Sequence, residues 1–576
     1  MKYIKSIEEN LNEHQKKALQ DIFEPTVVGV PLADSRRDVC ILPSGEIRSY
    51  QRMHGNGVSE GVVEYISSVD GGISWTKGYS EGKMQACTYV DEAGIYLSVA
   101  DKFSHGVKGF WCLRSAIGPD DMEPQWVKMS DDDYYDSFLP VKSAFSNRVW
   151  VTAQKYGTCT PTFFYSDDFG LTWQKREVEH SAEFCLKPPH KGLRWCKGSG
   201  SEPYAIELSE HKMMMLIRTA TDQFYQAFSY DGGDSWTHSE PSTFYGINTT
   251  PFLLRLTDGR VVTFWNNTKS LPEVDHSMTI PFDKGVFEGT GEDAFTNRDA
   301  AHCAITDDGG ETFIGYREIL LNEIRNNSDF RYKGGVKSSN DKSVHQFQAF
   351  ELPFNKILVS CGQNVASRRF VIFDADWLYE QSSKEDFLTG LNKVSTQVYL
   401  KSLSGHTAHK AGNGHCAWNR TNGAVMMPDP CGGYDEYLYV SKQHDDRLVS
   451  DIQGVVWNFP MSRKGSVKVI LKMVEKSARL ILTDRWYNPC DEFAMDDSPF
   501  GIEISSEEIG TNLIELVLDF DVDEGVLNTS INEKTIRTTK MNKACPTGLS
   551  YLMLQCATPD DSKGFYIKSM EKESGN

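Results

Sequence analysis

Short runs of apolar residues alternate with polar turns along most of the chain, and this pattern predicts strands rather than helices. Three clear units read strand, turn, strand: VCILPSGEIRSYQR from Val39, YAIELSEHKMMMLIRT from Tyr204 and FLLRLTDGRVVTFWN from Phe252. Each turn holds Ser, Gly or Asp, which favour tight reversals of the chain. The pattern therefore predicts an all-β protein that contains many small antiparallel sheets.

One octapeptide with the pattern S/T-x-D-x-G-x-S/T-W/F recurs four times. Its copies are SVDGGISW at 68–75, SDDFGLTW at 166–173, SYDGGDSW at 229–236 and TDDGGETF at 306–313. In such a turn the Asp carboxylate accepts backbone N–H groups, the Gly takes a positive φ, and the aromatic ring packs between sheets. Because each copy follows an apolar strand, the repeat predicts a set of equivalent hairpins.

This motif resembles the Asp-box, or BNR repeat, of sialidases and related β-propellers, and the resemblance covers roughly residues 30–380. In that family the box lies on the outer hairpin of a blade, far from the active site, so the boxes predict a fold and no chemistry. The resemblance implies a propeller, and counting the strand–turn–strand units predicts six blades, with seven as the alternative. The blades are expected to begin near Arg36, Gln85, Leu139, Glu202, Thr249 and His345.

Three regions are expected along the chain. Residues 1–26 predict a short helical segment packed on the next domain, because Leu11, Leu19, Ile22 and Phe23 fall roughly on one face. Residues 27–400 form the expected propeller. Residues 401–576 begin with a linker rich in Gly, Ser and His and continue as alternating strands without an Asp-box, which predicts a jelly-roll sandwich similar to concanavalin-like and other lectin-like modules.

Composition and charge argue against several classes of binding partner and cofactor. The formal net charge of −20 argues against nucleic-acid or anionic-membrane surfaces, and an anionic substrate then requires locally gathered arginines. The sequence shows neither a signal peptide nor an apolar transmembrane run, and the thirteen cysteines follow no disulfide or zinc spacing. We therefore expect a cytoplasmic protein without metal or cofactor, and we assign no metal to His406, His409 and His415. The oligomeric state stays open.

The candidate site follows from the sialidase pattern of three arginines that hold a substrate carboxylate. Arg36 or Arg37 stands at the start of the first blade, where the resemblance places the first arginine. Arg218 follows Glu202 by sixteen residues, which is similar to the spacing between the family's catalytic Glu and second arginine. Arg298 precedes the fourth box by eight residues, as the third arginine does. Asp299 and His302 flank Arg298 and are further substrate-binding candidates.

Two departures from the family pattern affect the expected chemistry. The general-acid Asp expected before the first box is not evident, and Glu60 is the nearest carboxylate. The nucleophilic Tyr expected on the opening strand of the last blade is absent, and His345 stands at or beside its place. The predicted catalytic residues are therefore Glu202, His345 and Glu60.

These residues allow two reactions on an acidic oligosaccharide that contains sialic or uronic acid. In exo-acting hydrolysis, a carboxylate or His345 activates water while a second group protonates the leaving oxygen. In a β-eliminating lyase, arginines neutralise a uronate carboxylate while His345 removes the neighbouring proton. We expect hydrolysis, with elimination as the alternative. A noncatalytic glycan-binding propeller is a third interpretation.

Overall fold

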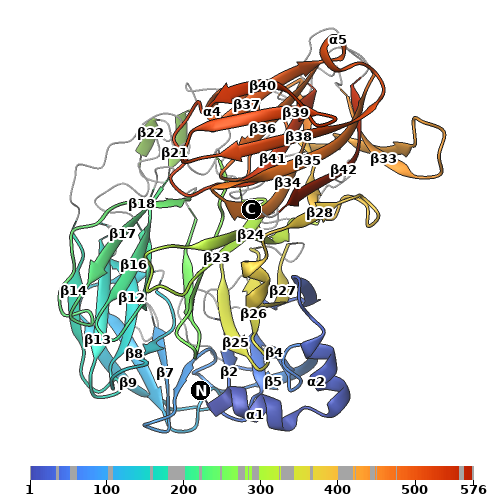
Figure 1. Ribbon diagram of the computed structural model, residues 1–576. Coiled ribbons are helices and arrows are strands. Elements are labelled where there is room, and N and C mark those ends of the chain that lie inside the picture. The colour runs from blue at the N-terminus through green and yellow to red at the C-terminus, as the bar shows by residue number, and fades with distance from the viewer. Residues whose placement is uncertain are drawn as a thin grey trace.

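A computed structural model describes residues 2–33, 38–51, 61–100, 108–135, 137–155, 158, 160–179, 201–219, 223–246, 249–269, 279–282, 285–288, 298–323, 325, 343–363, 367–399, 420–421, 423–441, 448, 450–474, 477–556 and 564–573. In these residues strands predominate, which confirms the all-β prediction (Figure 1). None of the helices in the described parts is long and apolar enough to cross a membrane.

The first two-thirds of the chain forms a series of antiparallel sheets, each built as a meander. The first sheets contain β2 (Val39–Ile41), β3 (Ile47–Tyr50), β4 (Val63–Ser68) and β5 (Thr76–Ser80); β6 (Thr88–Val90), β7 (Ile95–Ala100), β8 (Phe110–Ser115) and β9 (Gln125–Ser130); and β10 (Tyr134–Tyr135), β11 (Val141–Lys142), β12 (Val149–Lys155), β13 (Pro161–Ser166) and β14 (Gln174–Glu177).

The next sheets lie closest to the candidate site. They contain β15 (Ser201–Glu207), β16 (Met213–Arg218), β17 (Gln223–Ser229) and β18 (Glu240–Tyr245); β19 (Phe252–Arg255), β20 (Val261–Trp265), β23 (Ala300–Thr306) and β24 (Ile314–Leu321); and β25 (Gln348–Leu352), β26 (Lys356–Cys361), β27 (Arg369–Asp374) and β1 (Thr26–Gly29). A separate hairpin joins β21 (Thr279–Phe282) to β22 (Gly285–Glu288). The described residues thus hold six such sheets, and the choice between six and seven blades stays a prediction.

The first strand of the chain completes the last of these sheets. Val27 of β1 lies opposite Val371 of β27, so a segment near the N-terminus is the outer strand of a blade formed by residues 348–374. This pairing closes the series of blades and covers an otherwise exposed strand edge. The sequence pattern did not indicate it, because strand partners distant in the chain leave no local signal.

The four Asp-boxes have the predicted geometry. In the third box, Asp231 accepts the N–H of Ser235 at 2.9 Å and the hydroxyl of Ser229 at 2.8 Å, and Gly233 has a φ of 99°. The fourth box shows the electrostatic effect. Burial raises the pKa of Asp308, but hydrogen bonds from Thr312 and Thr306 outweigh it and lower this pKa to about 2. The boxes therefore stabilise ionised carboxylates within turns.

The blades have two distinct faces. The four boxes connect third to fourth strands, and we call their side the box face. On the opposite side, the loop face, β15 begins, β16 ends and β17 begins, with Ser201 paired to Arg218. The longest connections of the blades join strand ends at the loop face: 178–200, 266–299 and 322–347. Long loops at one end of a rigid scaffold are a usual place for a binding site.

Two helices cover part of the box face, where one helical segment was expected. They are α1 (Lys2–Asn10) and α2 (Glu13–Gln20), and a capping box of Asn12 and Gln15 starts the second helix. Leu11 and Leu19 are buried against blade residues, as predicted, but Phe23 is 42% exposed, so its placement on the packed face was wrong.

Two further sheets form the C-terminal part, most of whose strands are drawn in orange and red in Figure 1. One contains β28 (Ser383–Glu385), β32 (Val425–Pro428), β33 (Glu436–Val440), β35 (Lys464–Met473), β38 (Leu513–Asp521), β39 (Val526–Ile531), β40 (Lys534–Lys540) and β42 (Phe565–Glu573). The other contains β29 (Val394–Ser395), β34 (Gln453–Ser462), β36 (Ser477–Thr483), β37 (Phe500–Ser505) and β41 (Leu549–Cys556). Shorter elements are β30 (Val398–Tyr399), β31 (Arg420–Thr421), the 3-10 helix η2 (Ala375–Tyr379), α4 (Ala494–Asp497) and α5 (Ser506–Ile509).

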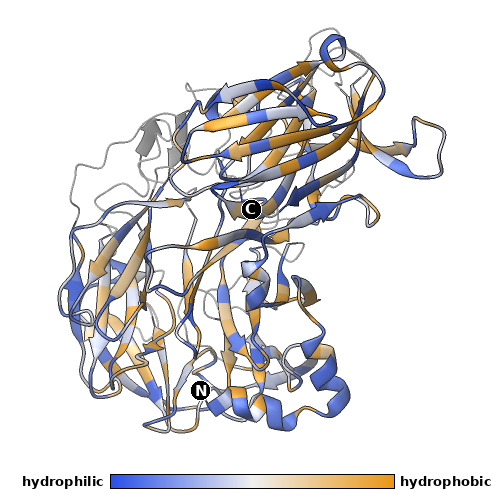
Figure 2. Ribbon diagram, viewed as in Figure 1, coloured by the Kyte–Doolittle hydropathy of each residue, from blue (hydrophilic) through white to orange (hydrophobic). Residues whose placement is uncertain are grey.

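These two sheets share one hydrophobic core, to which each contributes apolar residues such as Trp457 and Leu516. Figure 2 shows the hydrophobic positions along the C-terminal strands, whereas α1 and α2 are largely hydrophilic. The two-sheet arrangement is consistent with a β-sandwich. The likeness to lectin modules stays a prediction.

The C-terminal sheets dock on the loop face. Trp486 is fully buried there and exchanges backbone hydrogen bonds with the chain after β20: its N–H donates to Asn267 O at 2.9 Å, and its O accepts from Lys269 N at 2.8 Å. A hydrophobic cluster that includes Ala300 and Tyr551 continues across the boundary. The two parts therefore share a packed interface beside the start of β23.

Candidate functional site

Glu202 and Arg218 form a buried ion pair at the loop face. Glu202 lies near the start of β15 and Arg218 at the end of β16, so antiparallel pairing brings them together. Arg218 Nη1 donates to Glu202 Oε2, and Thr250, just before β19, donates its hydroxyl to the same oxygen at 2.8 Å. Both charged side chains are only 3% exposed. A guanidinium on its oxygen stabilises the ionised form of Glu202, which suits it to hold charge rather than to deliver a proton.

Two residues near the beginnings of inner strands have a strained backbone. Glu202 has a φ of 50° and Gln346, beside His345, has a φ of 69°. A non-glycine residue in this region costs about 1–3 kcal/mol and persists where the surrounding structure imposes it. The strain at both positions supports a functional role for this end of the blades.

Arg298 and His345 form the second pair of the site. Arg298 Nη1 lies 2.8 Å from His345 Nε2, and both residues are fully buried. A guanidinium has donors only, so Nε2 must accept this hydrogen bond and the ring proton must be on Nδ1. The imidazole is therefore neutral, with its lone pair held by a cation.

The backbone links these groups across neighbouring blades. Val344 N–H donates to Arg298 O at 2.9 Å, which fixes the approach to β25 against the approach to β23. Asn266, at the end of β20, donates to Ala300 O at 2.6 Å and also contacts Val344 O at 3.4 Å. Glu202, Arg218, Arg298 and His345 thus lie at or next to strand ends of three adjacent sheets, all at the loop face, and their functional roles stay predictions.

Asp299 and His302, predicted as substrate-binding residues, form hydrogen bonds with residues outside their own strand. Asp299 Oδ2 accepts from Tyr399 Oη and, at 3.3 Å, from Gln397 Nε2. His302 Nδ1 accepts the N–H of Asn267 at 3.0 Å, and its Nε2 contacts Tyr551 Oη on the C-terminal sheet. Both side chains thus contact segments that follow the propeller.

His302 belongs to a hydrogen-bonded chain inside the docking interface. Because Nδ1 accepts from Asn267, Nε2 carries the proton and donates to Tyr551, whose hydroxyl donates to Glu318 Oε1 at 2.7 Å. Burial lowers the pKa of His302 to about 3 and raises the pKa of Glu318 to about 7. The imidazole is therefore neutral, and Glu318 titrates near neutrality.

The pKa of Glu318 predicts a pH-dependent stability. The unfolded carboxyl ionises near its ordinary value of 4.5, but the folded one holds its proton to about 7, so stability falls as pH rises between these values. Glu318→Gln should remove this decline and be more stable than the parent at pH 8, by up to about 3 kcal/mol. Urea unfolding at pH 5 and pH 8 measures this, with the exposed Glu524→Gln as control. A parent protein more stable at pH 8 than at pH 5, unchanged by Glu318→Gln, would contradict it.

Several predicted residues lie outside the described residues. They are Arg36, Arg37 and Glu60, together with His406, His409 and His415 of the expected linker. Their roles stay predictions. Within the described parts of the chain, no cluster of three or more His, Cys, Asp or Glu side chains is arranged to hold a metal ion.

Sequence reasoning missed Thr250, Asn266 and Asn267. A signal for them exists in the repeat itself. Thr250 precedes β19 much as Glu202 opens β15, and Asn266 follows β20 as Arg218 ends β16. Comparing equivalent positions in successive blades would have found them, because equivalent positions meet at the same face.

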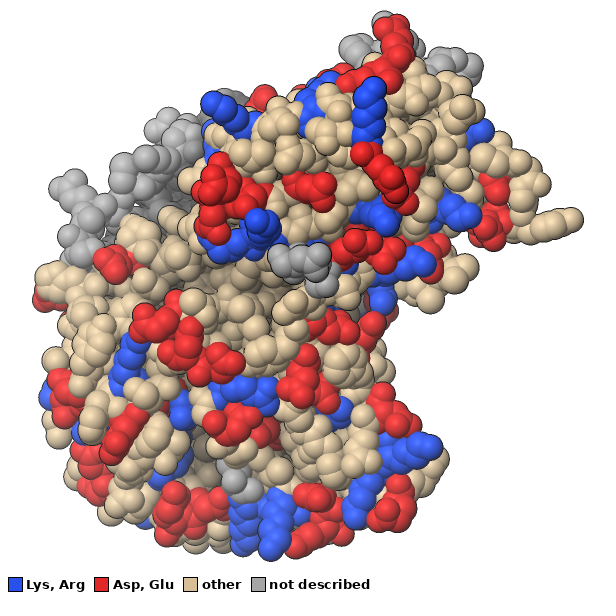
Figure 3. All heavy atoms as spheres, viewed as in Figure 1, with Lys and Arg blue, Asp and Glu red and all other residues tan. Residues whose placement is uncertain are grey.

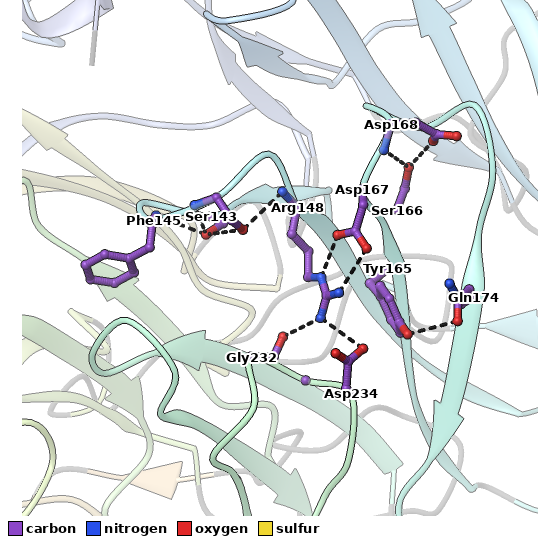
Figure 4. A network of polar contacts seen from close by, with 12 residues as sticks. Ser143, Phe145, Arg148, Tyr165, Ser166, Asp167, Asp168, Gln174, Gly232 and Asp234 are labelled. Atoms are coloured by element: carbon purple, nitrogen blue, oxygen red, sulfur yellow. Dashed lines mark hydrogen bonds and ion pairs between the residues drawn. The ribbon is translucent and has the colours of Figure 1, made fainter.

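A further, partly buried arginine lies on the box face. Arg148 joins two boxes there, with its guanidinium 2.7 and 2.9 Å from the Asp167 carboxylate and 2.8 Å from Gly232 O (Figure 4). It also lies over the Tyr165 ring, 4.0 Å from the centroid. This contact between boxes is structural, and it separates Arg148 from Arg218 and Arg298.

The visible surface carries both charge signs. On the face shown in Figure 3, acidic and basic side chains are interspersed, and no large basic patch stands out despite the net charge of −20. Arg218 and Arg298 are instead buried, in contact with Glu202 and His345 respectively.

The sequence matches the family model of the BNR repeat-like domain over residues 138–333. This stretch contains the second, third and fourth boxes, so the match agrees with the repeat that the sequence shows there. A comparison with curated protein sequences finds no match.

Similar solved structures include a protein of unknown function from Dyadobacter fermentans, with 17% identity over 61% of this chain and 97% of that one and a TM-score of 0.38. A Trypanosoma rangeli sialidase in complex with 2,3-difluorosialic acid is 10% identical over 96% and 94% of the two chains, with a TM-score of 0.35. An exo-β-1,3-galactanase from Phanerochaete chrysosporium with β-1,3-galactotriose is 7% identical over 96% and 100%, with a TM-score of 0.34.

Proposed function

We propose that this protein is a carbohydrate-active enzyme that cleaves an acidic oligosaccharide at the loop face, with β-elimination from a uronate as its reaction. One observation carries this proposal: Arg298 and His345 are in direct contact, 2.8 Å apart. In β-elimination the base removes the proton next to the carboxylate, so the base and the carboxylate-binding cation must be neighbours. A pair of a neutral imidazole and a guanidinium meets this requirement.

The proposed reaction begins when the substrate binds. The substrate carboxylate binds the N–H groups of Arg298, which releases the lone pair on His345 Nε2. That nitrogen takes the α-proton of the uronate, and the C–H electrons form a carbon–carbon double bond in the ring. The bond from the β-carbon to the glycosidic oxygen breaks, and the leaving oxygen takes the proton that His345 has removed, which returns the imidazole to its neutral form. Arg298 neutralises the negative charge that develops on the carboxylate, while Arg218 is held by Glu202 at the same face.

Hydrolysis is the second candidate, and the spacing of Glu202 and Arg218 favours it, since it resembles the sialidase pattern. An inverting hydrolase needs an acid and a base on either side of the bond, about 6.5–9.5 Å apart. Glu202 is held as a carboxylate by Arg218, which suits a base or a charge-holding group. The proton donor would then have to be another residue. In the elimination His345 can both remove the α-proton and return it to the leaving oxygen, so no separate proton donor is required, and for this reason we rank it first.

The two reactions give different products. The purified protein is incubated with uronate-containing oligosaccharides and with sialosides, and ultraviolet absorbance and released sugar are followed together. A conjugated uronate that absorbs in the ultraviolet is the expected product. Free saturated sugar without new absorbance would replace elimination by hydrolysis. Tight binding without turnover would indicate the noncatalytic glycan-binding alternative.

A further inference from the structure

The segment that connects the propeller to the C-terminal sheets contacts the candidate site from outside the blades. Gln397 and Tyr399 are both buried, and both direct polar atoms to Asp299 Oδ2. Asp299 is the next residue after Arg298, which contacts His345. Two groups beyond the last blade therefore hold a residue adjacent to the proposed carboxylate-binding arginine.

This segment is firmly anchored. The Arg325 guanidinium donates to the Val394 carbonyl at 2.9 and 2.6 Å and to Leu391 O at 2.8 Å. Ser395 pairs with Val456 of the C-terminal sheet and lies 3.3 Å from Trp486 Nε1. Because residues 391–395 are tied to Arg325 and to the C-terminal sheet, Gln397 and Tyr399 follow directly on an anchored stretch of the chain.

Backbone hydrogen bonds hold the stretch that contains Arg298 and Asp299. Asn322 N–H donates to Asp299 O at 3.0 Å, and Val344 N–H donates to Arg298 O at 2.9 Å. The backbone is thus fixed, but backbone bonds alone do not hold a buried carboxylate in place. The Tyr399 hydroxyl and the Gln397 amide both donate to this carboxylate. When one of these donors is lost, the guanidinium of the neighbouring Arg298 becomes a stronger competitor for the carboxylate.

We propose that Tyr399, assisted by Gln397, is a positioning residue of this site: it engages the Asp299 carboxylate and so leaves Arg298 directed at His345 and at a substrate carboxylate. This inference rests on the proposed function. It also means that the site is built jointly by the propeller and the connecting segment. Asp299, predicted as a substrate contact, acts through Arg298 instead.

The test removes one hydroxyl. Tyr399→Phe keeps the ring, and we expect kcat/KM on the uronate substrate to fall about 10- to 100-fold, the scale for a misplaced binding group. Because Arg298 recognises charge, the loss should be larger on the acid than on its methyl ester, so the acid-to-ester ratio of kcat/KM should fall. A merely structural defect would lower both equally. Gln397→Met, of similar length, should give the same pattern more weakly, and the exposed Tyr434→Phe is the matched control.

A double-mutant cycle adds a second readout. If Tyr399 acts through Arg298, Tyr399→Phe should cost much less in the Arg298→Lys background than in the parent. Equal losses in both backgrounds, or an unchanged acid-to-ester ratio in Tyr399→Phe and Gln397→Met, would overturn the inference while the parent stays active. A parent inactive on all acidic oligosaccharides overturns the proposed function itself, and the inference with it.

Discussion

Replacing His345 by alanine is expected to lower kcat/KM on the acidic substrate by at least about a hundredfold, the usual lower scale for loss of a positioned base. The fully buried imidazole is neutral, and its Nε2 lies 2.8 Å from Arg298. Alanine removes this lone pair and leaves Arg298 in place, so substrate binding should weaken less than turnover. Steady-state kinetics therefore should show the loss mainly in kcat.

The control for this prediction is His238→Ala, which removes an imidazole that is 62% exposed. Its kinetics should match those of the parent. Added imidazole should restore part of the rate of His345→Ala, because a small base can enter the space that the side chain leaves. If His345→Ala turns over at more than half the parental rate with an unchanged melting temperature, His345 is not the base.

Local sequence signals predicted the parts of the fold that local interactions determine. The Asp-box carboxylates, such as Asp231, bond to residues two and four positions away, so the octapeptide contains its own partners. The pairing of Glu202 with Arg218 was also accessible, because one hairpin of β15 and β16 brings them together. The first strand of each blade begins close to its predicted position, because the local strand–turn–strand pattern marks it.

Contacts between distant segments could not be predicted in this way. Asp299 bonds to Tyr399, 100 residues later, and His302 to Tyr551, 249 residues later. Both were reasonable substrate contacts by position, since they flank Arg298. Their partners lie in segments whose docking depends on the shape of two whole sheets, and no spacing or alternation encodes that. The same holds for β1, whose partner strand β27 is the last of the propeller.

Separating Arg218 from Glu202 should produce the largest loss of stability. Their ion pair is 3% exposed on both sides, so Arg218→Met removes the guanidinium from a buried carboxylate that keeps its bond from the Thr250 hydroxyl. Removal of one partner of a buried pair typically costs about 3–5 kcal/mol. Urea denaturation should show this loss, and Glu202→Gln should both destabilise the protein and lower its rate at least about a hundredfold.

The double variant Glu202→Gln/Arg218→Met distinguishes pairing from simple loss of packing. If the charges stabilise each other, the double variant should lose clearly less stability than the sum of the single losses, because no buried charge is left without its partner. The exposed pair of Lys393 and Glu24, each about half exposed, provides the control: Lys393→Met should cost less than about 1 kcal/mol. Additive losses at the buried pair would instead mean that each side chain contributes through its own packing, and Glu202 would then be free to act with a different partner when substrate binds.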